Sequence, residues 1–270
     1  MIITTKAVYA VHIIVGILHF VVGLFSVILR AQFSEHFLFN GKLPLTCFKM
    51  AKTEDGSKRA FSDLTLDQAC ATYDLILVCA LLHLATAIAH AWYAYLGTSL
   101  KWRWAEYTIS APIVFLHTAL TSGSRDVGTL ILIAVCTSAI MPLGYVMEDS
   151  DPPRVPHTDD EILEIEGMQT KRIPYSICIF CGWFVVLSVL FVTLWNFLNI
   201  AENGAGDAKV PEFVYGIILS ELILLPSFGG AAMLHSRLGN NASNVLHAFL
   251  SFSSKILPTV IYLSSIYDSN

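Results

Sequence analysis

The residue with the clearest capacity for chemistry is Lys255, which lies in the apolar segment SFSSKILPTV (residues 251–260). An ammonium group near the middle of a membrane helix costs about 2.5–3.5 kcal/mol on insertion scales. A lysine side chain reaches the membrane surface from a helix end, but not easily from the centre. Lys255 is therefore either half of an ion pair that joins two helices, or an amine kept to condense with an aldehyde as a Schiff base.

A buried cation needs an anion, and few carboxylates lie within the apolar runs. The candidates are Asp74, Glu106 and Glu221. The third and seventh runs are parallel, and a helical side chain leans toward its own N-terminus, so Lys255 reaches toward the level of Glu106. Ser251 and Ser110 lie four residues from Lys255 and Glu106, respectively. They share those helix faces and can hydrogen-bond to either group.

Membrane-spanning helices must position these residues. The chain has 270 residues, of which 55% are hydrophobic and 14% charged, whereas a soluble domain carries about 25% charged residues. Seven apolar runs are long enough to cross a bilayer as helices: residues 7–29, 69–96, 102–120, 128–147, 173–199, 212–235 and 243–267. The runs contain prolines that should kink the helices rather than end them: Pro112, Pro142, Pro226 and Pro258.

We expect a single all-α, seven-helix membrane domain over residues 1–270. A long loop, residues 30–68, joins the first two helices and folds as a short strand pair or a packed loop. An acidic, proline-rich linker, residues 148–172, joins the fourth and fifth helices. Cys178 and Cys181 form a CxxC without a second ligand pair, so we expect no metal site. The net charge of −5 is spread between loops, and no basic patch indicates a nucleic-acid partner.

Other ionisable residues lie inside the runs. Glu221 is ten residues into the sixth run, where it serves either an ion path or a polar contact between helices. His12 and His19 are seven residues apart, as are His83 and His90, so each pair shares one helix face. Histidine titrates near neutrality and can relay protons. By depth, His19 and His83 are the relay candidates, with polar contacts between helices as the alternative.

Two motifs together resemble one family. RWAEYTISAP (residues 103–112) in the third run and SFSSK (residues 251–255) in the seventh are closely similar to heliorhodopsins. Ordinary microbial rhodopsins usually have RYxDW in the third helix and an aspartate four residues before the lysine, where this chain has RWAEY and Ser251. Animal opsins are disfavoured because the third run lacks a DRY-like triplet and the seventh lacks NPxxY.

The resemblance implies all-trans retinal on Lys255 as a protonated Schiff base, with Glu106 as counterion and isomerisation to 13-cis on illumination. It also implies a homodimer and an inverted topology with a cytoplasmic N-terminus. Counting Lys and Arg on the two sides does not fix this orientation, because they divide almost equally. We expect an integral, multi-pass protein of a plasma membrane or a host cell membrane.

A retinal polyene needs a slot of aromatic and small residues. The predicted walls, each of which ordinary helix packing explains equally well, are Met141, Gly144, Trp183, Phe184 and Phe228.

Two functions from different classes, neither of them enzymatic, follow from the resemblance. The first is a photoreceptor that signals through retinal isomerisation to an unidentified partner, as most heliorhodopsins do not pump ions. The second is light-gated proton transport or a channel that uses Glu106 and Glu221, since some viral members pass protons. A seven-helix transporter without retinal would require Lys255 to be only structural.

Overall fold

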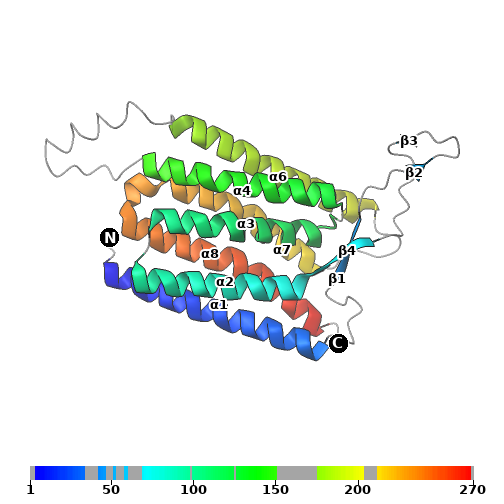
Figure 1. Cartoon of the computed structure of the whole chain (residues 1–270), viewed down its shortest axis with the longest axis horizontal. Coiled ribbons are helices and arrows are strands. Elements are labelled where there is room, and N and C mark those ends of the chain that lie inside the picture. The colour runs from blue at the N-terminus through cyan, green and yellow to red at the C-terminus, as the bar shows by residue number, and fades with distance from the viewer. Residues whose placement is uncertain are drawn as a thin grey trace.

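The computed structural model describes residues 4–33, 42–46, 51–52, 58–59, 69–97, 99–124, 126–150, 175–203 and 212–268. Within these residues, seven helices lie side by side along the long axis of the molecule (Figure 1). They are α1 (Thr5–Phe33), α2 (Leu75–Leu96), α3 (Leu100–Thr121), α4 (Val127–Ser150), α6 (Tyr175–Asn203), α7 (Glu212–Met233) and α8 (His235–Asp268). The predicted seven-helix bundle is confirmed.

Successive helices run in opposite directions, which defines two ends of the bundle (Figure 1). The N-terminal end holds the start of α1 and the connection from α2 to α3. The strand end holds the turn from α3 to α4 and short antiparallel strand pairs. β1 (Lys42–Thr46) pairs with β4 (Ala69–Asp74), and β2 (Ala51–Lys52) pairs with β3 (Lys58–Arg59). A strand pair was one of the two expectations for this connection.

The start of the second helix differs from the prediction. Residues 69–74 form β4, and α2 begins only at Leu75. Asp74 caps the helix because its carboxylate accepts a hydrogen bond of 2.9 Å from the Leu77 backbone N–H. The same carboxylate pairs with Arg30, whose Nη2 lies 2.7 Å from Oδ2. Asp74 is therefore occupied at the strand end of the bundle, far along α2 from the level of Lys255.

The end of the fourth helix also differs. α4 continues to Ser150, so Glu148 belongs to a helix rather than to the predicted linker. The rest of that linker, residues 151–172, lies outside the described residues. The four prolines expected within helices do lie inside α3, α4, α7 and α8.

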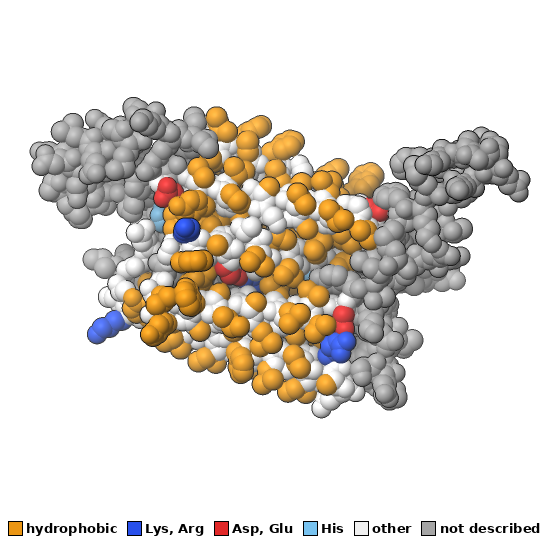
Figure 2. Space-filling model, in the orientation of Figure 1, with side chains coloured by type: hydrophobic (Ala, Val, Ile, Leu, Met, Phe, Trp, Pro, Cys, Tyr) orange, Lys and Arg blue, Asp and Glu red, His pale blue; other side chains and the backbone are white. Residues whose placement is uncertain are grey.

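The exterior of the bundle is apolar. Figure 2 shows hydrophobic side chains across this face, with charged side chains mostly toward the two ends. Six helices, α1, α2, α4, α6, α7 and α8, are long and apolar enough to cross a membrane. α3 is less apolar because Lys101, Arg103 and Glu106 lie in its first two turns. The charges of Arg103 and Glu106 need oppositely charged partners inside the bundle, and both side chains form ion pairs there.

Among the described residues, buried side chains form three hydrophobic clusters, and two of them bear on the functional site. The larger lies toward the strand end and includes Leu120 and Ile217, which are fully buried. The smaller lies toward the N-terminal end and includes Trp104, Tyr107 and Met147. The functional cavity lies where the two clusters meet, because residues of both line it.

Candidate functional site

Lys255 is buried in α8, with 3% of its side chain exposed. Its Nζ lies 2.7 Å from Glu106 Oε1 of α3, and Glu106 is 14% exposed. The ammonium group also donates to the Thr86 hydroxyl of α2 at 3.2 Å and lies 5.8 Å from the centre of the Tyr107 ring, within the range of a cation–π contact. The parallel course of α3 and α8 brings Lys255 and Glu106 together, as the sequence argument expected.

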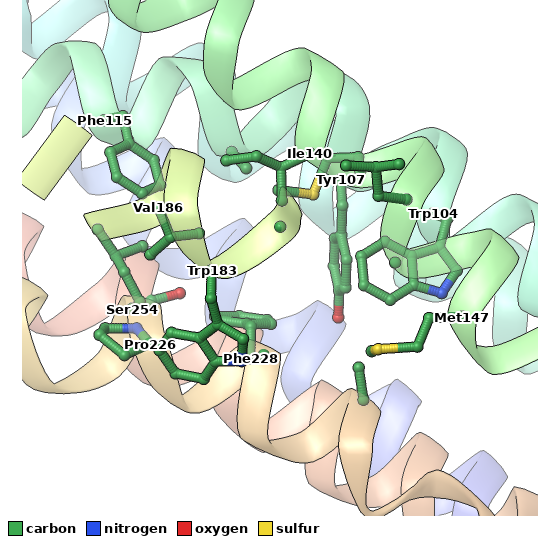
Figure 3. Close-up of a pocket in the computed structure, with 18 of the residues that line it drawn as sticks. Trp104, Tyr107, Phe115, Ile140, Met147, Trp183, Val186, Pro226, Phe228 and Ser254 are labelled. Carbon is green, nitrogen blue, oxygen red and sulfur yellow. The ribbon is translucent and has the colours of Figure 1, made fainter. Parts of the chain in front are cut away.

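A cavity extends from Lys255 between α3, α4, α6, α7 and α8. Its empty space, including its open mouth, is about 900 Å³. In Figure 3 the Trp104 and Tyr107 rings lie side by side at one end and Phe115 lies toward the other. The Trp104 and Tyr107 rings meet edge to face, with centres 5.7 Å apart. The walls are therefore aromatic and apolar, with one amine at the edge.

Two glycines shape this cavity. A Cβ at Gly144 would overlap the Trp104 ring, where Cζ2 would be 2.8 Å away and two other ring atoms closer still. A Cβ at Gly229 would be 3.1 Å from Cζ2 of Trp183. Each glycine thus gives room to an indole ring that lines the cavity.

Four of the five predicted wall residues line the cavity: Met141, Gly144, Trp183 and Phe228. Ser110 of α3 lines it as well.

The prediction for Phe184 needs correction. Its side chain is 64% exposed and stacks on Phe180 at the outside of α6, with ring centres 6.3 Å apart. Phe184 lies about 100° further around α6 than Trp183, and this rotation turns its side chain away from the cavity and toward the outside of the bundle. Gly182 and Val186 of α6 line it instead.

The two predicted serines are both buried, but neither hydroxyl hydrogen-bonds to Lys255. The Oγ atoms of Ser110 and Ser251 have no hydrogen-bond partner among the residues that the structure describes. Ser251 does not line the cavity, whereas Ser254, three residues further along α8, does. Thr86, which sequence reasoning missed, makes the hydroxyl contact to Lys255.

A second buried ion pair adjoins the cavity, and sequence reasoning missed it as well. The Glu148 carboxylate pairs with the Arg103 guanidinium and accepts hydrogen bonds from Trp104 Nε1 (3.0 Å) and His247 Nε2 (2.9 Å). The Glu148 side chain is fully buried. Glu148 is seven residues after Met141, a predicted wall residue, so the helical period carried a signal for it.

The relay candidates and Glu221 lie in different parts of the bundle. His19 Nδ1 and His83 Nδ1 are 2.8 Å apart, and His83 Nε2 lies 3.0 Å from the Thr259 hydroxyl. Glu221 is 1% exposed, and neither carboxylate oxygen has a partner within the described part of the chain. Leu225, one turn further along α7, lines the cavity.

The fold and this site define a class: a seven-helix membrane protein of the rhodopsin type. A crystal structure of Exiguobacterium sibiricum rhodopsin matches 98% of this chain and 98% of its own length, with a TM-score of 0.67 and 11% sequence identity. At that identity the likeness concerns the fold alone.

The chain belongs to the heliorhodopsin family, because the family model described as Heliorhodopsin matches residues 8–243. Comparison with curated protein sequences found no significant match. Family and fold together make this chain a retinal-binding, light-sensing, multi-pass membrane protein.

The site residues fit retinal. A polyene aldehyde requires an amine at the edge of a long apolar slot, and Lys255 with the aromatic cavity supplies both. The glycines beside Trp104 and Trp183 let flat rings line the slot, where larger side chains would displace them. A cation at Lys255 requires a carboxylate within contact distance, and Glu106 is in that position.

Proposed function

We propose that Lys255 carries all-trans retinal and that Glu106 is the counterion, so that the protein senses light through retinal isomerisation. The observation that carries this proposal is the 2.7 Å contact between Lys255 Nζ and Glu106 Oε1 at the edge of an aromatic cavity. When bound, retinal supplies the light-absorbing polyene, joined to the lysine as a protonated Schiff base.

The residues of the chain divide the remaining work. Glu106 balances the positive charge on the Lys255 nitrogen. The Thr86 hydroxyl, which accepts from the free amine at 3.2 Å, is a second acceptor near the single N–H that a protonated Schiff base keeps. The Tyr107 ring faces the same charge. Trp104, held by its bond to Glu148, forms one wall of the slot. The apolar lining excludes water and thereby strengthens the ion pair.

The visible absorption spectrum tests this proposal. We expect purified protein supplied with all-trans retinal to develop a visible band that hydroxylamine bleaches, and Lys255→Ala to lack that band. Lys101→Ala is the matched control, because Lys101 is an exposed lysine of α3 and its loss should leave the band intact. Folded wild-type protein without a visible band would overturn the proposal.

A second candidate, light-gated proton conductance, rests on Glu221. A carboxyl group buried in the apolar core one turn from a cavity residue is costly unless it serves a purpose. We expect Glu221→Gln to abolish any light-induced current in expressing cells while leaving the visible band unchanged. Wild-type cells without photocurrent across a range of voltages would exclude conductance and favour the sensor.

The proposal includes the inverted orientation of the family, with the N-terminal end of the bundle in the cytoplasm. A membrane-impermeant thiol reagent applied to single-cysteine variants at Lys6 would label them from the cytoplasmic side only. The homodimer and the signalling partner stay predictions. Light scattering of the detergent-solubilised protein tests the first, and light-dependent crosslinking in host membranes tests the second.

A further inference from the structure

One fully buried histidine, His247 of α8, lies directly behind the walls of the cavity. Its ring centre is 5.9 Å from that of Trp104, 6.0 Å from that of Tyr107 and 6.1 Å from that of Phe228. These three aromatic residues, which Figure 3 labels, line the cavity, and His247 does not. His247 is therefore the residue on which aromatic walls from α3 and α7 rest.

A polar ring is costly in this position unless it is hydrogen-bonded. His247 Nε2 donates to Glu148 Oε1 at 2.9 Å. The buried histidines between α1 and α2 bond instead to each other: His12 with His90 and His19 with His83. A phenylalanine at position 247 would fill a similar volume without any polar cost. What the histidine adds is a directed bond to a carboxylate.

The Glu148 carboxylate joins two aromatic rings from different helices. One oxygen, Oε1, accepts from His247 of α8, and the other, Oε2, accepts from Trp104 Nε1 of α3 at 3.0 Å. Because a carboxylate is planar, one bond to each oxygen fixes the position of the indole relative to the imidazole. Arg103 holds the carboxylate in place and balances its charge, and the same guanidinium donates to Asn244 of α8.

Two further contacts restrict the walls. The Tyr107 hydroxyl donates to the backbone carbonyl of His247 at 3.2 Å, which ties a second cavity ring to the same residue. The Trp104 ring also occupies the space that a Cβ at Gly144 would need. Trp104 is therefore held by its bond to Glu148 at one edge and by the backbone of α4 against its ring, so it cannot turn without losing one of these contacts.

We propose that His247, oriented by Glu148, is a positioning residue that makes the cavity selective for the all-trans isomer of retinal. The proposal rests on the proposed retinal site and deepens it. An all-trans polyene is straight, whereas a 13-cis polyene is bent near the end joined to the lysine. Walls in fixed positions favour one of these shapes over the other, since selectivity is a difference between two binding free energies. Walls that can shift accept both shapes.

The size of the effect follows from the hydrogen bond that is lost. One hydrogen bond contributes about 1 kcal/mol net, which corresponds to a change of about fivefold in an equilibrium ratio. Removing the bond between His247 and Glu148 should therefore raise the ratio of 13-cis to all-trans retinal in the dark about fivefold. The ion pair between Arg103 and Glu148 stays intact in such a variant, so no buried charge loses its partner.

Chromatography of retinal extracted from dark-equilibrated pigment measures this ratio. We expect His247→Leu to raise it about fivefold. His247→Gln, whose amide N–H can donate to Glu148, should restore it toward the wild-type value. The matched control is His117→Leu, the same substitution at a buried histidine of α3. His117 packs against the Tyr262 ring and does not line the cavity, so this variant should keep the wild-type ratio.

A second variant approaches the cluster from the cavity side. Trp104→Phe keeps an aromatic wall and removes only the indole N–H that bonds to Glu148, so it should also raise the 13-cis share. This variant decides the question if His247→Leu forms no pigment. A cluster that only stabilises the protein would behave differently, because His247→Leu would then bleach at a lower temperature without any change in the isomer ratio. That result would overturn the positioning role.

The outcomes separate the two proposals. A visible band together with the wild-type isomer ratio in both His247→Leu and Trp104→Phe would refute the positioning role and leave the retinal site standing. A wild-type protein without a visible band would refute the retinal site, and the positioning role with it.

Discussion

Neutralising Glu106 tests the counterion assignment through the colour of the pigment. Glu106→Gln keeps the size of the side chain and removes its charge, 2.7 Å from Lys255 Nζ. On excitation, positive charge moves from the lysine nitrogen into the polyene and away from the carboxylate. Glu106 therefore stabilises the ground state more than the excited state, and its removal should shift the absorption maximum to the red.

The magnitude follows from the distance. Two unit charges 2.7 Å apart interact by about 6 kcal/mol at an effective dielectric constant of about 20. If excitation doubles the distance between the positive charge and the carboxylate, the excited state keeps about half of this attraction. The wild-type carboxylate therefore adds about 3 kcal/mol to the transition energy, and Glu106→Gln removes that amount. That is a few per cent of the energy of a visible photon, or a red shift of some tens of nanometres. Release of the proton is a ground-state equilibrium that loses the whole interaction of about 6 kcal/mol, so the variant should favour release by about 10⁴-fold.

The assay is a series of absorption spectra at several pH values. Glu106→Gln should show either the red-shifted band or, at higher pH, an ultraviolet band from pigment that has lost its proton. Glu106→Asp keeps the charge and should retain a band close to that of the wild type. Glu202→Gln changes an exposed carboxylate of α6 and is the remote control. A Glu106→Gln spectrum identical to the wild type at every pH would refute the assignment.

Two further predictions concern the walls of the cavity. Gly144→Ala places a methyl group into the Trp104 ring and should lower the yield of pigment, as measured by the ratio of visible to protein absorbance. Gly230→Ala, whose added methyl meets no atom within 4 Å, should leave that ratio unchanged, and equal ratios in the two variants would contradict the packing argument. Glu148→Gln leaves the buried Arg103 charge without its partner and should destabilise the protein by about 3 kcal/mol. Thermal bleaching should then occur at a lower temperature, and an unchanged midpoint would show that this ion pair does not stabilise the bundle.

The helices and the central pair could be predicted because each rests on a strong local rule. Apolar length identified the spanning runs, and the lean of helical side chains placed Lys255 beside Glu106. Both rules concern position along a helix axis, which follows directly from the order of residues in the sequence.

The errors occurred where the outcome depends on which way a side chain faces around its helix, or on which residues of another helix it contacts. Phe184 was predicted as a wall residue beside Trp183, although neighbours in a helix face different ways. Glu148 was assigned to a linker because its charge ended the apolar run, whereas its partner Arg103 lies 45 residues away and keeps it inside α4. The contact between His12 and His90 likewise depends on how α1 and α2 pack, which periodicity alone does not determine.

The attachment of retinal to Lys255 is the central claim, and chemical trapping tests it most directly. Borohydride treatment of the illuminated pigment, followed by proteolysis and mass spectrometry, should find a retinyl adduct on the peptide that contains Lys255 and on no other. Lys255→Ala should yield no adduct. An adduct on another lysine, or visible pigment without any adduct, would contradict the account.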